Sequence, residues 1–208
     1  MCATLIRYSI TGMLVLAHAG LSLPAGAEES AQAHPLAIHM NQWLEGSREW
    51  STPNPDYNPE NPRSFAEYRV RWDWDSFGQQ LLGKLFGVRA DGSTMLFWKL
   101  YSTYNPVTRT VIYQQIGSNG AYIHGEHPAR TEPVAFGEVE RLDSTLYGAD
   151  GTAKFTRHEN VFQADGTHHA NVYEKNKNGE WELANQWDWT LVPLEDVRGE
   201  ELAAVRTE

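Results

Sequence analysis

Three histidines in the C-terminal third of the sequence are the side chains best suited to proton transfer. His158 lies in one predicted strand, and His168 and His169 open the next. Neighbouring residues of a strand point to opposite faces, so one imidazole of the His168-His169 pair should face inward and could pair with His158. Imidazole titrates near neutral pH, which makes His158 and His169 the candidate catalytic bases of an enzyme. The alternative is that an inward histidine orients a ligand or belongs to the core.

The same tripeptide occurs twice, as Trp72-Asp73-Trp74 and as Trp187-Asp188-Trp189. In each copy both tryptophans share one face of a strand and the aspartate takes the other. Tryptophan buries a large apolar area, so we expect the tryptophans inward, around a cavity for a ring-bearing molecule. The reverse arrangement would place two carboxylates in an apolar space and raise their pKa values. The predicted ligand-binding walls are Trp72, Trp74, Trp98, Tyr113 and Trp187.

Charged residues alternate with the first pair of tryptophans, at Arg69, Arg71, Asp73 and Asp75. On an outer face they would form an ion-pair stripe that contributes little to stability. Facing a lumen, they would bind a polar group, and Arg71 is the residue we predict to orient a ligand there, together with His158.

A possible metal site is the sequence His124-Gly125-Glu126-His127. Imidazole and carboxylate groups are ligands of zinc, copper and iron. The spacing matches no named metal motif, however, and on a strand His127 would face away from His124 and Glu126. A solvated turn is therefore favoured, and we predict no metal ligand and no cofactor.

Several enzyme signatures are missing from the sequence. It contains no Gly-x-Ser-x-Gly, phosphate loop, His-Glu-x-x-His or dinucleotide fingerprint. Common hydrolase and nucleotide chemistry are therefore disfavoured. A cofactor-free lyase, isomerase or cyclase remains open, because such reactions need one base and one oriented donor.

The elements that must position these side chains are strands. Apolar and polar residues alternate with a period of two, and the segments are separated by turn sequences such as Asp91-Gly92 and Asn178-Gly179. A meander with open edges invites aggregation, so we predict an all-β fold, a single up-and-down antiparallel barrel. The ten predicted strands are 47–50, 67–75, 79–88, 95–103, 109–116, 121–126, 134–145, 153–162, 167–175 and 180–192.

Two segments before the main run of strands differ from it. Residues 31–43 carry Leu36, Met40 and Trp43 at helical spacing, which predicts a short helix that closes one end of the barrel. Residues 51–62 contain four prolines and predict an extended loop, either on the surface or as a lid over the barrel mouth.

The N-terminus has the order of a secretory signal. Arg7 precedes an apolar stretch over 10–23, and small residues follow Pro24, so we predict a signal peptide over 1–27, a barrel domain over 28–193 and a charged tail over 194–208. The protein is then exported, to the periplasm or as a secreted protein. The apolar stretch is too short for a stable span, so none is predicted in the mature chain.

The whole chain has a net charge of −10. An acidic surface repels phosphates, so nucleic acid is a poor partner, and the expected partner is a small molecule. Its single cysteine, Cys2, precedes the predicted cleavage site, so the mature chain would hold no disulfide. The sequence gives no oligomeric state.

From Trp43 to Pro193 the chain resembles the calycin superfamily, which includes lipocalins, fatty-acid-binding proteins and nitrobindin-like barrels, and is most similar to its uncharacterised branch. The stretches that carry the resemblance are 43–46 with Trp50, 104–109, 120–126, 165–167 and 178–181. The resemblance implies a cavity for a small, largely apolar ligand. Nitrobindin-like proteins hold haem through a histidine on a late strand, but 180–192 has none. Haem would have to recruit His158, His168 or His169.

Three hypotheses follow. The first is an exported barrel that binds a small, mostly apolar or aromatic ligand. The second is a lyase, isomerase or cyclase on the same barrel, with His158 or His169 as the base. The third is a barrel that binds haem or a metal ion.

Overall fold

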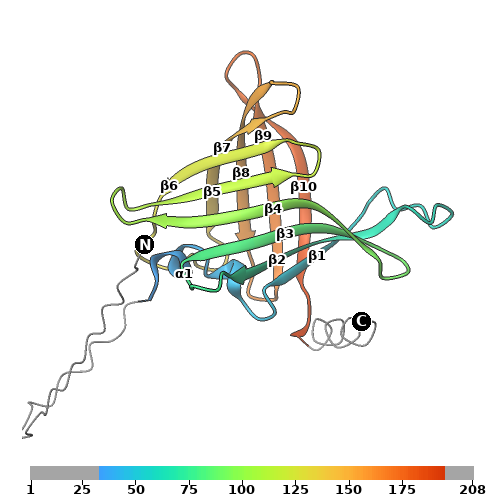
Figure 1. The fold of residues 1–208 in the computed structure, drawn as a ribbon, viewed down its shortest axis with the longest axis horizontal. Helices are drawn as coiled ribbons and strands as arrows, with labels where there is room; N and C mark the ends of the chain where they lie inside the picture. The colour runs from blue at the N-terminus through green and yellow to red at the C-terminus, as the bar shows by residue number, and fades with distance from the viewer. Residues whose placement is uncertain (1–32, 195–208) are drawn as a thin grey trace, which may run out of the picture. The chain divides into compact units, whose positions relative to one another are not determined.

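Strands make up most of residues 33–194, the part of the chain that the computed structural model describes (Figure 1). The ten strands of this part are β1 Glu49–Pro53, β2 Phe65–Trp74, β3 Gln80–Arg89, β4 Thr94–Asn105, β5 Thr110–Gly117, β6 Tyr122–Pro128, β7 Val139–Tyr147, β8 Ala153–Phe162, β9 Thr167–Lys175 and β10 Trp181–Leu191. Consecutive strands pair antiparallel and β1 pairs with β10, which closes the barrel. The predicted all-β, ten-stranded barrel is confirmed. The predicted signal peptide and all but the first residue of the predicted tail lie outside the described residues.

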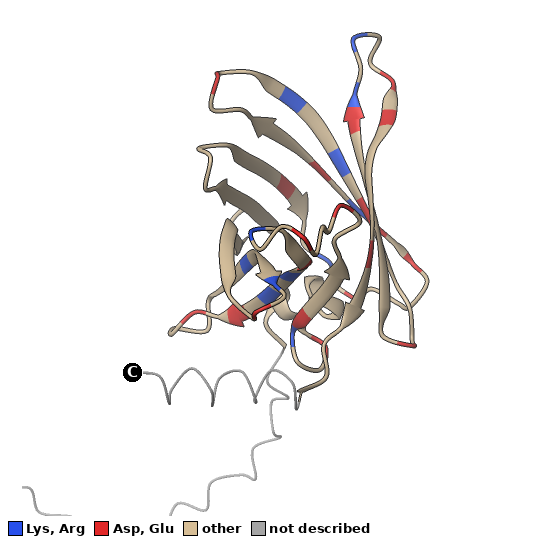
Figure 2. Cartoon of the chain, turned by 90° about the vertical axis from the view of Figure 1, so that its right-hand side faces the viewer, with Lys and Arg blue, Asp and Glu red and all other residues tan. Residues whose placement is uncertain are grey.

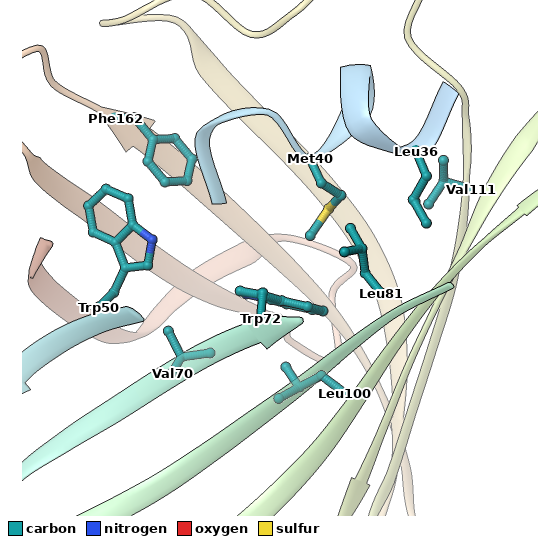
Figure 3. Packing of buried hydrophobic residues seen from close by; sticks show 9 residues of the cluster. All are labelled: Leu36, Met40, Trp50, Val70, Trp72, Leu81, Leu100, Val111 and Phe162. Carbon is teal, nitrogen blue, oxygen red and sulfur yellow. The ribbon is translucent and has the colours of Figure 1, made fainter. Parts of the chain in front are cut away.

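The predicted helix is shorter in the structure. It consists of α1, Pro35–His39, followed by a 3₁₀ turn at Gln42–Leu44. Pro35 suits the first turn because it has no N–H to satisfy, and His34 caps the helix by accepting a hydrogen bond from the Leu36 N–H at 3.2 Å. The helix side chains enter the barrel. In Figure 3, Leu36 lies beside Val111 and Met40 points towards Leu81 and Trp72.

The first strand was predicted over 47–50, but β1 extends to Pro53, so the start of the predicted loop belongs to a strand. The largest difference in a strand boundary is at the start of β7. Strand β7 begins at Val139 rather than at Val134. The Val134 carbonyl accepts a hydrogen bond from Gln42 Nε2 at 2.8 Å, and its N–H donates to Asn41 Oδ1 at 2.9 Å. Both backbone groups of Val134 are thus used to fasten the helical segment to the loop, so they are not available for a strand ladder.

The alternation of side chains assigns the two faces of the wall. Val70 and Trp72 on β2 are buried inside the barrel. Their neighbours along the strand, Arg71 and Asp73, lie on the outer face. The core cluster of buried residues joins α1 to several strands; it comprises Leu36, Met40, Trp50, Val70, Trp72, Leu81, Leu100, Val111 and Phe162. Charged residues lie along several strands and at the turns (Figure 2). Within residues 33–194, no helix has the length and apolarity that a bilayer crossing requires.

Two neighbouring pairs of strands are joined over short stretches. Between β6 and β7, Tyr122, Ile123 and His124 pair with Tyr147, Leu146 and Thr145. Between β1 and β10, Trp50 and Ser51 pair with Leu191 and Thr190. By contrast, β3 pairs with β2 and β4 along almost its whole length. We call these two short pairings, between β6 and β7 and between β1 and β10, the seams of the barrel wall.

Candidate functional site

A cavity of about 450 Å³ opens at the end of the barrel away from α1. Its aromatic lining comes from the start of β2 and β4 and from the middle of β10: Tyr68, Phe97, Trp98, Trp187 and Trp189. Leu85, Ser118 and Asn119 complete the lining. We call this space the mouth cavity. Rings on several sides make it suited to a flat apolar molecule.

A β-bulge explains why two consecutive residues of β4 both line the mouth cavity. Leu85 pairs with Trp98 and the next residue, Phe86, pairs with Leu96, so Phe97 is an extra residue without a partner in this ladder. An extra residue breaks the strict alternation of faces and bends the strand locally. Phe97 and Trp98 therefore both line the mouth cavity.

A second cavity of about 150 Å³ lies deeper in the lumen, and we call it the inner cavity. Leu85, Trp187 and Trp189 line both spaces, so the mouth cavity and the inner cavity are adjacent and share a wall. Aromatic contacts hold this shared wall in place. The rings of Tyr68 and Trp187 meet edge to face at 5.8 Å, and the centroids of Trp187 and Trp189 lie 6.4 Å apart.

Four polar side chains take part in the lining of the inner cavity: Tyr113, Gln115, His158 and Asn160. Gln115 is hydrogen-bonded to the Tyr113 hydroxyl, and His158 lies on β8. Burial lowers the pKa of His158 to about 4 and raises the pKa of Tyr113 well above its usual value. At neutral pH the imidazole is therefore uncharged and the phenol keeps its proton.

A buried hydrogen-bonded chain lies beside the inner cavity. Asn160 Nδ2 donates to Glu140 Oε2 at 3.3 Å, and Trp43 Nε1 donates to the same oxygen at 3.4 Å. His168 Nε2 lies 3.1 Å from Asn160 Oδ1, which can only accept, so the imidazole donates. Burial raises the pKa of Glu140 to about 7, an effect that the hydrogen bonds from Trp43 and Asn160 partly oppose.

Glu140 was not among the candidates of the sequence analysis. A signal was present, because Glu140 and Leu142 share a face of an alternating strand and Leu142 is an obvious core residue. A carboxylate on the apolar face of a strand is rare unless it has partners or a function. Its partners, Trp43 and Asn160, come from other elements, so they could not be recognised from the strand alone.

The predicted wall residues are divided between the two cavities and the barrel end. Trp72, Tyr113 and Trp187 line the inner cavity, and Trp98 and Trp187 line the mouth cavity. Trp74 lines neither, because it lies at the end of β2 with its ring 5.4 Å from the ring of His34.

The two predicted orienting residues lie on opposite sides of the wall. His158 lines the inner cavity. Arg71 lies on the outer face, where its Nε is 3.3 Å from Asp73 Oδ2 and its Nη1 is 3.9 Å from Glu49 Oε2. Arg71 therefore belongs to the outer ion-pair stripe, and the structure does not bring it to the cavities.

The two predicted catalytic histidines are not brought together. His169 faces outward, with Nδ1 2.6 Å from Asp188 Oδ1. His168 is the inward member of the pair and is fully buried. At the proposed metal motif, Gly125 and His127 share a face while His124 and Glu126 take the other. In the described part of the chain, no three histidine, aspartate or glutamate side chains form a group that could hold a metal ion.

The proline-rich segment between β1 and β2 is an exposed loop at the mouth end of the barrel. The Asn54 side chain anchors its start to the Phe65 carbonyl at 2.8 Å. Of the described residues, none between 54 and 64 lines the mouth cavity or the inner cavity.

No model of a known protein family matches the chain, and no curated protein matches its sequence. The closed ten-stranded antiparallel barrel is consistent with the calycin-like resemblance.

Proposed function

We propose that this barrel binds a small, mostly apolar or aromatic molecule, with the rings of the ligand in the mouth cavity and its far end in the inner cavity. The observation that supports this most directly is the mouth cavity walled by Tyr68, Phe97, Trp98, Trp187 and Trp189, with the inner cavity adjacent to it. Apolar burial would supply the affinity, and aromatic contacts in a preformed wall would reduce the entropy cost of binding.

The N-terminal sequence supports an exported protein. Signal peptidase recognises a positive residue, then an apolar stretch, then small residues. The segment before position 28 has this order and begins it with Arg7. We propose that the ligand is bound outside the cytoplasm, in the periplasm or after secretion.

The enzyme hypothesis receives less support from the arrangement. His158 is far from ideal as a base, because a pKa of about 4 makes its neutral imidazole a weak proton acceptor at neutral pH. His169, the other candidate, pairs with Asp188 on the outer face. A carrier needs neither group to exchange a proton.

The test uses N-phenyl-1-naphthylamine, an uncharged probe whose fluorescence rises in apolar surroundings. We expect the protein to bind it and Trp187→Ala or Trp98→Ala to weaken binding by about tenfold, because each removes part of the wall. Trp181→Ala is the matched control, since Trp181 lies outside both cavities, under the Arg157 guanidinium at 4.4 Å. Equal binding by all the variants, or no binding by the wild type, would overturn the proposal. Circular dichroism of each variant shows whether it is folded.

A further inference from the structure

We propose that the ligand carries an uncharged hydrogen-bond-accepting group, such as a ketone or amide carbonyl, which binds in the inner cavity between the Tyr113–Gln115 pair and His158. This inference rests on the proposed function and narrows its ligand to uncharged ring compounds with one polar end. Carboxylates and other anions are excluded from the class.

The first support is the absence of charge around the described cavities. Neither the mouth cavity nor the inner cavity is lined by a lysine, arginine, aspartate or glutamate of residues 33–194. A ligand carboxylate in the inner cavity would be desolvated without a cationic partner, which is strongly unfavourable. The buried Glu140, close enough to Tyr113 to raise its pKa, makes the potential on this side less favourable to an anion.

The second support is a spare donor in the Tyr113–Gln115 pair. If the Gln115 amide donates to the tyrosine oxygen, the phenol proton has no acceptor among the described residues. If the amide is turned over, the phenol donates to the amide oxygen and the amide N–H groups are spare. Either arrangement leaves a donor in the wall of the inner cavity for a ligand acceptor.

The third support is His158. It lies in the middle of β8, paired with Leu142 and Val172, and it is half-buried although it faces the barrel interior. Its accessible surface therefore faces the inner cavity, which it lines. Burial is the sole cause of its lowered pKa, and within residues 33–194 no group hydrogen-bonds to the ring. A neutral imidazole has one N–H donor to offer a ligand.

The neighbouring Asn160 is already engaged. Its oxygen accepts from His168 and its amide donates to Glu140. Tyr113, Gln115 and His158 each line the inner cavity, and we expect a carbonyl oxygen to bind the spare donors of these groups first.

The sizes of the two spaces fix the direction of the ligand. About 150 Å³ is roughly the volume that holds one benzene-sized group, whereas the mouth cavity, at about 450 Å³, holds a fused ring system. The polar end would therefore enter first and the rings would remain among the tryptophans.

Three probes that share one ring system test the inference: naphthalene, 2-acetonaphthone and 2-naphthoate. Binding to the full-length protein is measured by titration calorimetry near pH 8, where the carboxylate is ionised. We expect 2-acetonaphthone to bind about fivefold or more tightly than naphthalene, because it gains a hydrogen bond. We expect 2-naphthoate to bind about tenfold or more weakly than naphthalene, because its charge would be desolvated.

The variants assign the preference to the named groups. His158→Leu, and the double variant Tyr113→Phe with Gln115→Leu, should each reduce the advantage of 2-acetonaphthone while naphthalene still binds. Tyr122→Phe is the matched control, because Gln114 Nε2 donates to its hydroxyl at 2.9 Å on the outer face, in the same chemistry as the inner pair.

Each outcome is decisive. Equal affinity for naphthalene and 2-acetonaphthone, or 2-naphthoate binding as tightly as 2-acetonaphthone, overturns the inference. The proposed function stands in that case if Trp187→Ala still weakens naphthalene binding. Failure of all three probes to bind overturns both.

Discussion

The imidazole of His168 stacks on the ring of Phe162, with centroids 4.1 Å apart and planes 10° from parallel. The two residues are direct partners across β8 and β9. The rings of Trp43 and Trp50 meet the imidazole edge-on at 4.8 Å and 5.7 Å. The titratable imidazole of His168 is thus packed among aromatic rings inside the barrel, where a positive charge would be desolvated.

Acid should destabilise the protein through His168. Burial and the nearby His169 lower its pKa from 6.5 to about 3, so between these values the unfolded chain binds a proton that the folded protein does not. Stability is therefore lost as the pH falls through this window, by roughly 2 kcal/mol at about pH 5 from this residue. The pKa values of His158 and His39 are also lowered, to about 4, and act in the same direction. Guanidinium denaturation of His168→Phe should show a smaller loss between neutral and acid pH than the wild type.

The control for this prediction is His169→Gln, which changes a half-exposed ring on the outer face. It should retain most of the acid sensitivity of the wild type. If His168→Phe lost stability with acid as steeply as the wild type, the buried imidazole would not be the cause.

Glu140 should act in the opposite sense. Burial raises its pKa from 4.5 to about 7, so between these values the folded protein holds a proton that the unfolded chain has released. This residue therefore costs stability as the pH rises, on the order of 3 kcal/mol once the pH exceeds 7. Glu140→Gln should be more stable relative to the wild type at about pH 8 than at about pH 4.5. Glu126→Gln, on the outer face, should show no such change, and an equal effect of both variants would contradict the prediction.

Gly83 should be intolerant of a methyl group. A Cβ at this position would lie 2.9 Å from two ring atoms of Trp72 and 3.0 Å from Leu100 Cβ. Trp72 is fully buried and is the direct partner of Gly83 on β2, so the ring cannot move aside without disturbing the cavity wall. Gly83→Ala should lower the free energy of unfolding by about 1–3 kcal/mol. The measurement is chemical denaturation, with near-ultraviolet circular dichroism to follow Trp72. Lys84→Ala, on the outer face of the same strand, should change stability little.

Hydrogen exchange should be fastest at the two seams. The first residues of β7 pair with β8 but not with β6. The pairing between β6 and β7 joins Tyr122–His124 to the last residues of β7. Peptides that contain the start of β7 should therefore exchange faster than peptides from the middle of β3, which has partners on both sides. Mass spectrometry of exchanged peptides measures this directly. Equal protection of the two regions would show that the short ladders do not weaken the wall.

The sequence predicted the architecture well because alternation and turn residues act locally. It predicted the lining less completely. Trp72 and Trp187 could be expected inward from their apolar area, but Phe97 enters the lining through a bulge, which depends on how β3 and β4 are aligned. The alternation did not show which of His168 and His169 faces inward, and that choice depends on the pairing of His168 with Phe162. Arg71 remained ambiguous because its face is fixed by closure of the barrel around the tryptophans.

The positions of the two seams divide the barrel wall into two continuous runs of the chain. Strands β1 to β6 form one run and β7 to β10 the other, and residues 129–138 connect them. Each run can keep its own ladders if the spacing between the runs changes, since the ladders that join the runs are the short ones at Tyr122–His124 and at Trp50–Ser51. A small change in the angle between the two runs would move Trp187 and Trp189 of β10 relative to Tyr68 of β2 and Phe97 of β4, so the width of the mouth cavity would change with it.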